Sequence, residues 1–170
     1  MKKSSLLLYA SIALFFSCSQ GPKVDVVIQN GTLYDGTGSP PFIGTVAIKG
    51  DKIVYVGPPK FFRADQNINA TDKAVSPGFI NMLSWGVDSL IEDGKSQSDI
   101  FQGVTLEVFG EGMSWGPLND PLKASMKKKQ GDIQYEITWT TLGEYLQFLE
   151  DKGVSTNVAS FLGATTLRIN

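Results

Sequence analysis

The sequence predicts an α/β protein in which a small N-terminal antiparallel β unit is followed by repeated βα segments. Two observations support this fold class. First, alternating apolar runs at residues 45–49 and 52–56 flank Gly50-Asp51, a pattern typical of a β-hairpin closed by a two-residue turn. Second, apolar strand candidates after Pro77 alternate with helical or loop segments, and such alternation indicates parallel βα units.

The expected β unit covers residues 24–76. A β-branched run at residues 24–28 predicts a strand, and the turn-forming residues 29–32 that follow it predict a tight turn. Residues 67–70 and 74–75 are shorter strand candidates. Together with the hairpin, these segments predict a compact antiparallel sheet.

The expected βα segments occupy residues 77–170. The strand candidates are residues 79–83, 104–109 and 158–162, and a short helix is expected at residues 96–102. The clearest helix begins at Thr141, because Thr141 and Glu144 have the spacing of a capping box in which each side chain binds a first-turn amide. Apolar residues then repeat at helical spacing as far as Gly153, which predicts the end of that helix.

Residues 1–18 predict an export signal that is not part of the fold. A short basic start precedes the apolar run 6–16, which is too short to span a bilayer as a mature helix. The end of this run resembles a bacterial lipobox, which implies cleavage before Cys18 and lipid attachment to its sulfur. We therefore expect an exported protein, a periplasmic or outer-membrane-associated lipoprotein of a bacterium, with the membrane as a partner through the lipid anchor. An ordinary secretory signal with an incidental Cys18 is the alternative.

Composition excludes several functional classes. The net charge is -2 with both signs scattered, so the chain has no basic surface for nucleic acid, and no nucleic-acid partner is expected. The one run of like charge, residues 127–129, predicts a solvated loop. Cys18 is the single cysteine, which excludes an intrachain disulfide framework. There is no histidine, so the folded part lacks both of the residue types that zinc prefers.

A series of segments, in order along residues 24–170, resembles the amidohydrolase superfamily and, within it, the N-acyl-D-amino-acid deacylases, also called D-aminoacylases. These segments are residues 27–38, the hairpin around Gly50-Asp51, and residues 70–72, 76–81, 102–105, 157–163 and 166–168. The resemblance implies that residues 77–170 form the first part of a (β/α)8 TIM-like barrel that is incomplete in this chain. About 90 residues follow Pro77, enough for roughly three of the eight βα units.

Members of this family hydrolyse an amide with a divalent metal at the mouth of the barrel, where the metal polarises the carbonyl and activates water. The resemblance implies a divalent metal in the complete protein, with zinc as the expected ion, and a small-molecule N-acyl amino acid or related amide as the substrate. The metal-binding His-X-His pair that usually ends the first strand matches Leu83 and Trp85 here, and neither can coordinate zinc. No complete metal site is therefore expected in this chain.

Glu111 is the candidate metal ligand of this chain, because it lies in the Gly-rich loop after the second strand, where deacylases carry a metal-binding Cys. A solvated surface glutamate is the alternative interpretation. The His that usually follows the third strand is also replaced, and Ala164 in its place offers no side-chain chemistry. Four further acidic residues near the expected mouth are interpreted as solvated loop charges: Asp88, Glu92, Asp93 and Asp99. The sequence identifies no catalytic residue.

Three functional hypotheses follow. The first is a hydrolase acting on carbon-nitrogen bonds other than peptide bonds in linear amides, of which this chain is an N-terminal fragment that is inactive alone. The second is a non-catalytic envelope lipoprotein that keeps the amidohydrolase scaffold as a binding module, a hypothesis favoured by the replaced ligands at Leu83, Trp85 and Ala164. The third is a self-contained β domain with a helical tail.

Overall fold

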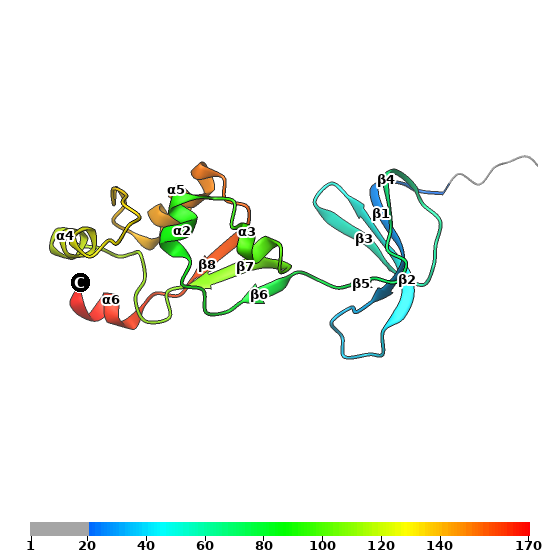
Figure 1. The fold of residues 1–170 in the computed structure, drawn as a ribbon, viewed down its shortest axis with the longest axis horizontal. Coiled ribbons are helices and arrows are strands. Elements are labelled where there is room, and N and C mark those ends of the chain that lie inside the picture. Colours follow the sequence, from blue (N-terminus) through cyan, green and yellow to red (C-terminus); the bar gives the residue numbers. More distant parts are fainter. Residues whose placement is uncertain (1–20) are drawn as a thin grey trace, which may run out of the picture. The chain divides into compact units, whose positions relative to one another are not determined.

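The computed structural model describes residues 21–170, so the predicted signal and Cys18 lie outside the described residues. A boundary between Pro77 and Gly78 divides the chain into two compact units, which we call the β unit and the α/β unit (Figure 1). None of the helices in the described part of the chain is long and apolar enough to cross a membrane.

The β unit is one five-stranded sheet. Its strands are β1 Lys23–Leu33, β2 Phe42–Lys49, β3 Lys52–Gly57, β4 Arg63–Asn69 and β5 Ala74–Val75, and four of them follow the order β3-β2-β1-β4, with β5 also paired to β1. The β2–β3 hairpin is confirmed: Gly50 adopts φ +59° in its turn, and the Gly50 amide donates to the Asp25 carboxylate at 2.6 Å. The positive φ explains why glycine begins the turn.

The purely antiparallel β unit that the sequence predicted is wrong in one respect. Strands β4 and β5 run parallel to β1, so the sheet is mixed. The chain between β3 and β4 crosses over and places Phe62 in the core, where it is buried with Val24, Val27 and Ala47. A connection of this kind allows parallel pairing, whereas a tight turn enforces antiparallel pairing. The alternation of apolar residues carries no information about strand direction.

The tight turn predicted at residues 29–32 is also absent, because β1 continues through it. The register of the β1–β2 pair shifts between Gln29 and Gly31, and Asn30 between them has φ +64°. One strand thus accommodates an extra residue as a β-bulge, and asparagine is among the few non-glycine residues that tolerate this conformation. The turn-forming residues therefore produce a bulge within β1 and not a reversal of the chain.

The α/β unit contains a three-stranded parallel sheet in the order β6-β7-β8, which confirms the predicted parallel βα arrangement. Its elements are β6 Phe79–Asn81, α2 Val87–Glu92, α3 Gln97–Ile100, β7 Val104–Phe109, α4 Asp120–Lys128, α5 Leu142–Lys152, β8 Asn157–Ser160 and α6 Ala164–Ile169. Strand β6 is shorter than the predicted residues 79–83. Helices α2 and α5 lie on one side of the sheet (Figure 1).

The core of the α/β unit lies between the sheet and these helices. Its buried members include Phe109 of β7, Leu90 of α2, and Tyr145 and Leu149 of α5. Each fully buried side chain of this size contributes about 1.5–3 kcal/mol relative to an exposed one. Large apolar side chains elsewhere on this unit are exposed: Phe79, Ile80, Met82, Leu83, Trp85, Phe101, Phe161, Leu162, Leu167 and Ile169.

Helix α5 begins and ends as predicted. The Thr141 hydroxyl accepts from the Glu144 amide at 3.1 Å, and the Glu144 carboxylate accepts from the Thr141 amide at 2.8 Å, which completes the capping box. Gly153 follows the helix with φ +76°, a left-handed conformation that glycine adopts without strain.

Helix α4 was not predicted, and the loop expected at residues 127–129 is wrong in part. Lys127 and Lys128 form the last turn of α4, and Lys129 caps it. At the other end, the Asn119 side chain accepts from the Leu122 amide at 2.9 Å. The lysine run therefore lies where a helix dipole favours cations.

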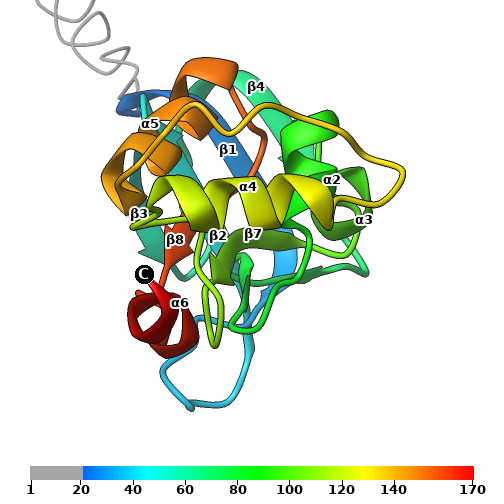
Figure 2. The same ribbon diagram turned by 90° about the vertical axis from the view of Figure 1, so that its left-hand side faces the viewer.

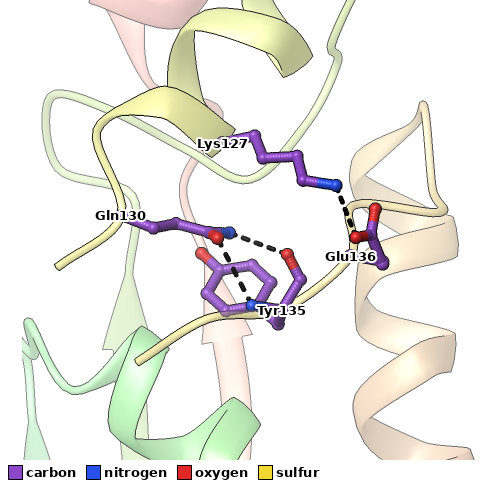
Figure 3. Close-up of polar contacts among 4 residues, drawn as sticks. All are labelled: Lys127, Gln130, Tyr135 and Glu136. Atoms are coloured by element: carbon purple, nitrogen blue, oxygen red, sulfur yellow. Dashed lines mark hydrogen bonds and ion pairs between the residues drawn. The ribbon is translucent and has the colours of Figure 1, made fainter. Parts of the chain in front are cut away.

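The segment after α4 is held by polar contacts (Figure 3). The Gln130 side-chain amide donates to the Tyr135 carbonyl at 2.9 Å and accepts from the Tyr135 amide at 3.3 Å, while Lys127 pairs with Glu136. The Tyr135 hydroxyl donates to Asp88 at 2.6 Å, which joins this segment to α2. Residues 129–141 thus pack as an ordered connection without regular secondary structure.

Candidate functional site

The candidate site lies at the carboxyl ends of β6, β7 and β8. Because the three strands are parallel, the segments that follow them meet at one edge of the sheet. These segments are residues 82–86, 110–119 and 161–163. Figure 2 faces this edge, with α4 and α6 in front.

The structure brings together three residues that the sequence singled out. Leu83, Trp85 and Glu111 line one small hollow, with Met113 and Trp115 among the other lining residues. Leu83 and Trp85 remain 49% and 71% exposed, whereas Ser84 between them is 9% exposed and points into the protein. The hollow encloses only about 10 Å³, room for about one water molecule. Ala164 is the first residue of α6 and does not line it.

The loop after β7 is fixed by close backbone approach to β8. Gly110 has φ +86°, and a Cβ atom at this position would lie 2.3 Å from the Phe161 carbonyl oxygen. The Phe161 amide donates to the Phe109 carbonyl at 2.8 Å, which locks the two segments together. Only glycine satisfies both the conformation and the space.

Further along, the same loop is joined to α6 through two buried hydroxyls. The Ser114 amide donates to the Thr166 hydroxyl at 2.8 Å, and the Thr166 hydroxyl donates to the Ser114 carbonyl at 3.2 Å. The Ser114 hydroxyl accepts from the Gly163 amide at 3.0 Å and donates to the Gly116 carbonyl at 2.6 Å. These contacts give the loop that carries Glu111 a fixed path between β7 and α6.

The described residues at this edge do not by themselves form a divalent-metal site. The hollow has one carboxylate, Glu111, and its other side-chain functional groups include aliphatic, indole and thioether groups. Within residues 21–170 there is no cluster of three or more Asp, Glu, His or Cys residues placed to hold an ion. A stable protein site for zinc needs three or four N, S or O ligands around one point. Glu111 could therefore supply one ligand, but the described residues complete no site.

Glu107, in the middle of β7, is a buried carboxylate that the sequence pattern alone did not indicate. It is 1% exposed, and three hydroxyls donate to it: Ser84 at 2.8 Å to one oxygen, and Ser96 at 2.6 Å and Thr156 at 3.0 Å to the other. These hydroxyls come from three different connections of the unit. The available signal was a charged residue inside the apolar run of β7, since Glu is almost never fully buried without partners.

A polar cavity of about 310 Å³ opens beside Glu107, between α2 and α3. Asp93 and Asp99, which the sequence interpretation left as solvated charges, line it together with Ser96 and Ser89. Asp88 instead accepts the hydrogen bond from Tyr135. The acidic residues of this region are thus divided between a cavity rim and a structural contact, and they do not converge with Glu111.

Two tyrosines of the core have raised pKa values. Burial raises the pKa of the Tyr135 phenol to about 12, and the hydrogen bond to Asp88 adds to this effect. Burial also raises the pKa of Tyr145 well above its usual range, and the Tyr145 hydroxyl has no hydrogen-bond partner. Both phenols therefore stay protonated at neutral pH, and neither can serve there as a base.

Comparison with known proteins finds similarity to deacylases. No family model matches the chain. The chain is 28% identical over 156 residues to D-aminoacylase of Alcaligenes xylosoxydans xylosoxydans. This match covers 89% of this chain and 31% of that protein. The chain is also 30% identical over 150 residues to N-acyl-D-glutamate deacylase of the same organism, covering 86% of this chain and 30% of that protein.

A solved structure gives the same result. The N-acyl-D-glutamate deacylase of Bordetella bronchiseptica, complexed with zinc and a phosphonate inhibitor that mimics the tetrahedral intermediate of the reaction, superposes with a TM-score of 0.70. The sequences are 26% identical, and the match covers 86% of this chain and 31% of that one. The chain thus spans about a third of the length of the relatives it matches.

Proposed function

We propose that this chain, whose homologues are D-aminoacylase and N-acyl-D-glutamate deacylase of the amidohydrolase family, is part of a longer hydrolase that cleaves a carbon-nitrogen bond in a linear amide. The observation that carries the proposal is sequence identity of 28–30% to these deacylases over 86–89% of the chain, together with the match in fold. By the same argument, the proposed substrate class is a small N-acyl amino acid or a related amide.

The architecture supports the barrel part of the proposal. Strands β6, β7 and β8 are parallel and carry helices on one side, while apolar side chains such as Ile80 and Leu83 remain exposed. Parallel sheets are normally covered on both faces. We propose that these strands begin a (β/α)8 barrel that polypeptide outside this chain completes, and that the 170-residue piece is inactive alone.

This chain could supply only one ligand to a metal like that of its relatives. A homologous deacylase structure contains zinc, and we propose a divalent ion in the complete protein, with Glu111 as the single ligand from this chain. Leu83 and Trp85, at the positions where family members carry His ligands, contribute none. Any further ligands therefore lie outside the described residues, and no chemical step is assigned to the ion.

One observation favours a second candidate function. Leu83 and Trp85 present an exposed apolar surface where a hydrolase of this family presents imidazole. A protein that kept the scaffold and lost the chemistry would show this replacement, so we propose a non-catalytic binding module of the cell envelope as the alternative. The lipid anchor at Cys18 and the exported location belong to both proposals.

The test uses the complete polypeptide that contains this chain. We expect bound divalent metal by elemental analysis and release of free carboxylic acid from N-acyl-D-amino acids. We further expect Glu111→Gln to lower metal content and hydrolysis together, because an amide oxygen is a weaker ligand than a carboxylate. Glu150→Gln, on the exposed face of α5, is the matched control and should change neither.

The results separate the two candidates. A protein that binds no divalent metal and releases no acid refutes the hydrolase and supports the binding module. Active protein whose metal content is unchanged by Glu111→Gln keeps the hydrolase and removes Glu111 from the metal site.

A further inference from the structure

We propose that Glu107 is a positioning residue: its carboxylate fixes the segment 83–85 so that Leu83 and Trp85 project at the carboxyl edge of the sheet. Glu107 does not line the hollow at that edge, and it contacts the segment 83–85 through the Ser84 hydroxyl. The inference does not depend on the proposed function, because it concerns the geometry of the segment and not the chemistry beside it.

Ser84 is the point of attachment. Its amide donates to the Val108 carbonyl at 3.0 Å, which ties the segment to β7 after the turn at residues 82–83. Its hydroxyl donates to Glu107 at 2.8 Å and accepts from the Gly86 amide at 3.3 Å. Ser84 is held inward by both backbone and side chain, whereas its two neighbours Leu83 and Trp85 stay 49% and 71% exposed.

The carboxylate itself is held rigidly, which makes it a useful anchor. While Ser84 binds one oxygen of Glu107, Ser96 and Thr156 donate to the other at 2.6 and 3.0 Å. Ser96 caps α3 in a left-handed conformation, φ +43°, which is uncommon for a residue with a side chain. The Ser96 bond therefore compensates local strain and prevents the carboxylate from rotating away from Ser84.

This arrangement is more specific than ordinary core packing. A buried apolar residue at position 107 would fill the same space without preferring one orientation of Ser84. A carboxylate that accepts three hydroxyl donors requires each donor to face it, since a buried charge without its hydrogen bonds is costly. The segment that it orients thereby explains the one charged residue of β7.

The test follows Trp85 by fluorine NMR in full-length protein labelled with 5-fluorotryptophan. Loss of one signal in Trp85→Phe assigns the resonance of Trp85, and loss of another in Trp139→Phe assigns that of Trp139. We expect Ser84→Ala and Glu107→Gln to shift or broaden the Trp85 signal while the Trp139 signal, from the core, keeps its position. Ser84→Thr, which retains the hydroxyl, should restore the signal of the unmutated protein.

Two controls match these variants. Glu92→Gln is the same substitution at an exposed site of α2, and Ser89→Ala removes a hydroxyl that lines the neighbouring cavity without binding Glu107. Neither should move the Trp85 signal. An unchanged Trp85 signal in Ser84→Ala overturns the proposal. If the Trp85 and Trp139 signals change together in Ser84→Ala, the network supports the whole core and the positioning role is likewise rejected.

Discussion

At the scale of single residues, Gly110 combines two constraints at the start of the candidate-site loop. Its φ of +86° disfavours any side chain, and a Cβ atom would lie 2.3 Å from the Phe161 carbonyl oxygen. We expect Gly110→Ala to lower the free energy of unfolding by about 2–4 kcal/mol, measured by urea denaturation, because strain and steric overlap add.

Gly112, two residues along the same loop, is the control for this substitution. A Cβ atom there would meet no heavy atom within 4 Å, and its φ is not positive. Gly112→Ala should change stability by less than about 0.5 kcal/mol. Equal destabilisation by the two substitutions would show that the loop does not take the described path.

For Tyr145 we expect a substitution that does not lower the free energy of unfolding. Its hydroxyl is buried without a hydrogen-bond partner, although its ring packs against Trp139 at a centroid distance of 5.2 Å. We expect Tyr145→Phe to leave the free energy of unfolding unchanged or to raise it by about 1 kcal/mol, because it removes a desolvated polar group and keeps the ring. Urea denaturation measures the effect.

The comparison variant is Tyr135→Phe. The Tyr135 hydroxyl donates to Asp88 at 2.6 Å and accepts from the Trp115 indole at 2.9 Å, so the substitution leaves both groups without this partner. A loss of about 1–2 kcal/mol is expected. If Tyr145→Phe were as destabilising as Tyr135→Phe, the Tyr145 hydroxyl would have a partner in solution.

At the scale of elements, the capping box of α5 makes stability depend on pH. The backbone amides of Thr141 and Thr140 donate to Glu144 and hold the pKa of its carboxyl below the usual 4.5. The folded state therefore binds the proton less readily than the unfolded chain. The contribution of Glu144 to stability is present above about pH 4.5 and is lost as the pH falls through the lower pKa of the folded state.

We expect Glu144→Gln to reduce the change in stability between pH 5 and pH 3, followed by urea denaturation at each pH. Glu150→Gln, on the same helix but outside the capping box, is the matched control and should leave the pH dependence as it is. A pH profile that is the same in Glu144→Gln and the unmutated protein would contradict the role of the carboxylate in the cap.

Elements with strong local signals could be predicted from the sequence, and the others could not. The α5 capping box and the β2–β3 hairpin depend on residues close in sequence, and both are found where they were expected. Helices α2, α4 and α6 were missed because each is short and is held by contacts with distant parts of the unit. The Asn119 cap of α4, for example, also donates to the Asn170 carbonyl at 2.6 Å, a contact across 51 residues.

At the scale of the whole molecule, the β unit has its own core. Val24, Val27, Ala47 and Phe62 are buried against one another on elements of the unit. We expect a polypeptide of residues 21–77 to fold cooperatively, with a stability of no more than about 3–5 kcal/mol because the unit is small. Circular dichroism during urea titration and the dispersion of amide NMR signals would measure this.

The control for this separated unit is Val27→Asp, which places a charge at a position with no exposed surface. It should abolish the cooperative transition. An unfolded spectrum for the unmutated residues 21–77 would instead mean that the β unit needs the rest of the chain.

The candidate site was predictable in part. Leu83, Trp85 and Glu111 were singled out by the resemblance to the deacylases, as matches to the family's metal-ligand positions, and the structure gathers them at one hollow. Their convergence follows from parallel pairing, which the βα alternation indicated. Glu107 escaped prediction because its partners Ser84, Ser96 and Thr156 are separated from it by 11 to 49 residues.

The sequence by itself determined the local features: the hairpin turn, the ends of α5, the βα alternation and the absence of histidine from the candidate site. Only the tertiary structure decided that β4 and β5 run parallel to β1, that Asn30 bulges a strand, and that Glu107 orients Ser84. The physical reason is the distance along the sequence over which each interaction acts. Backbone conformation and capping depend on neighbours a few residues away, whereas strand direction and the partners of a buried charge depend on how distant segments cross and pack.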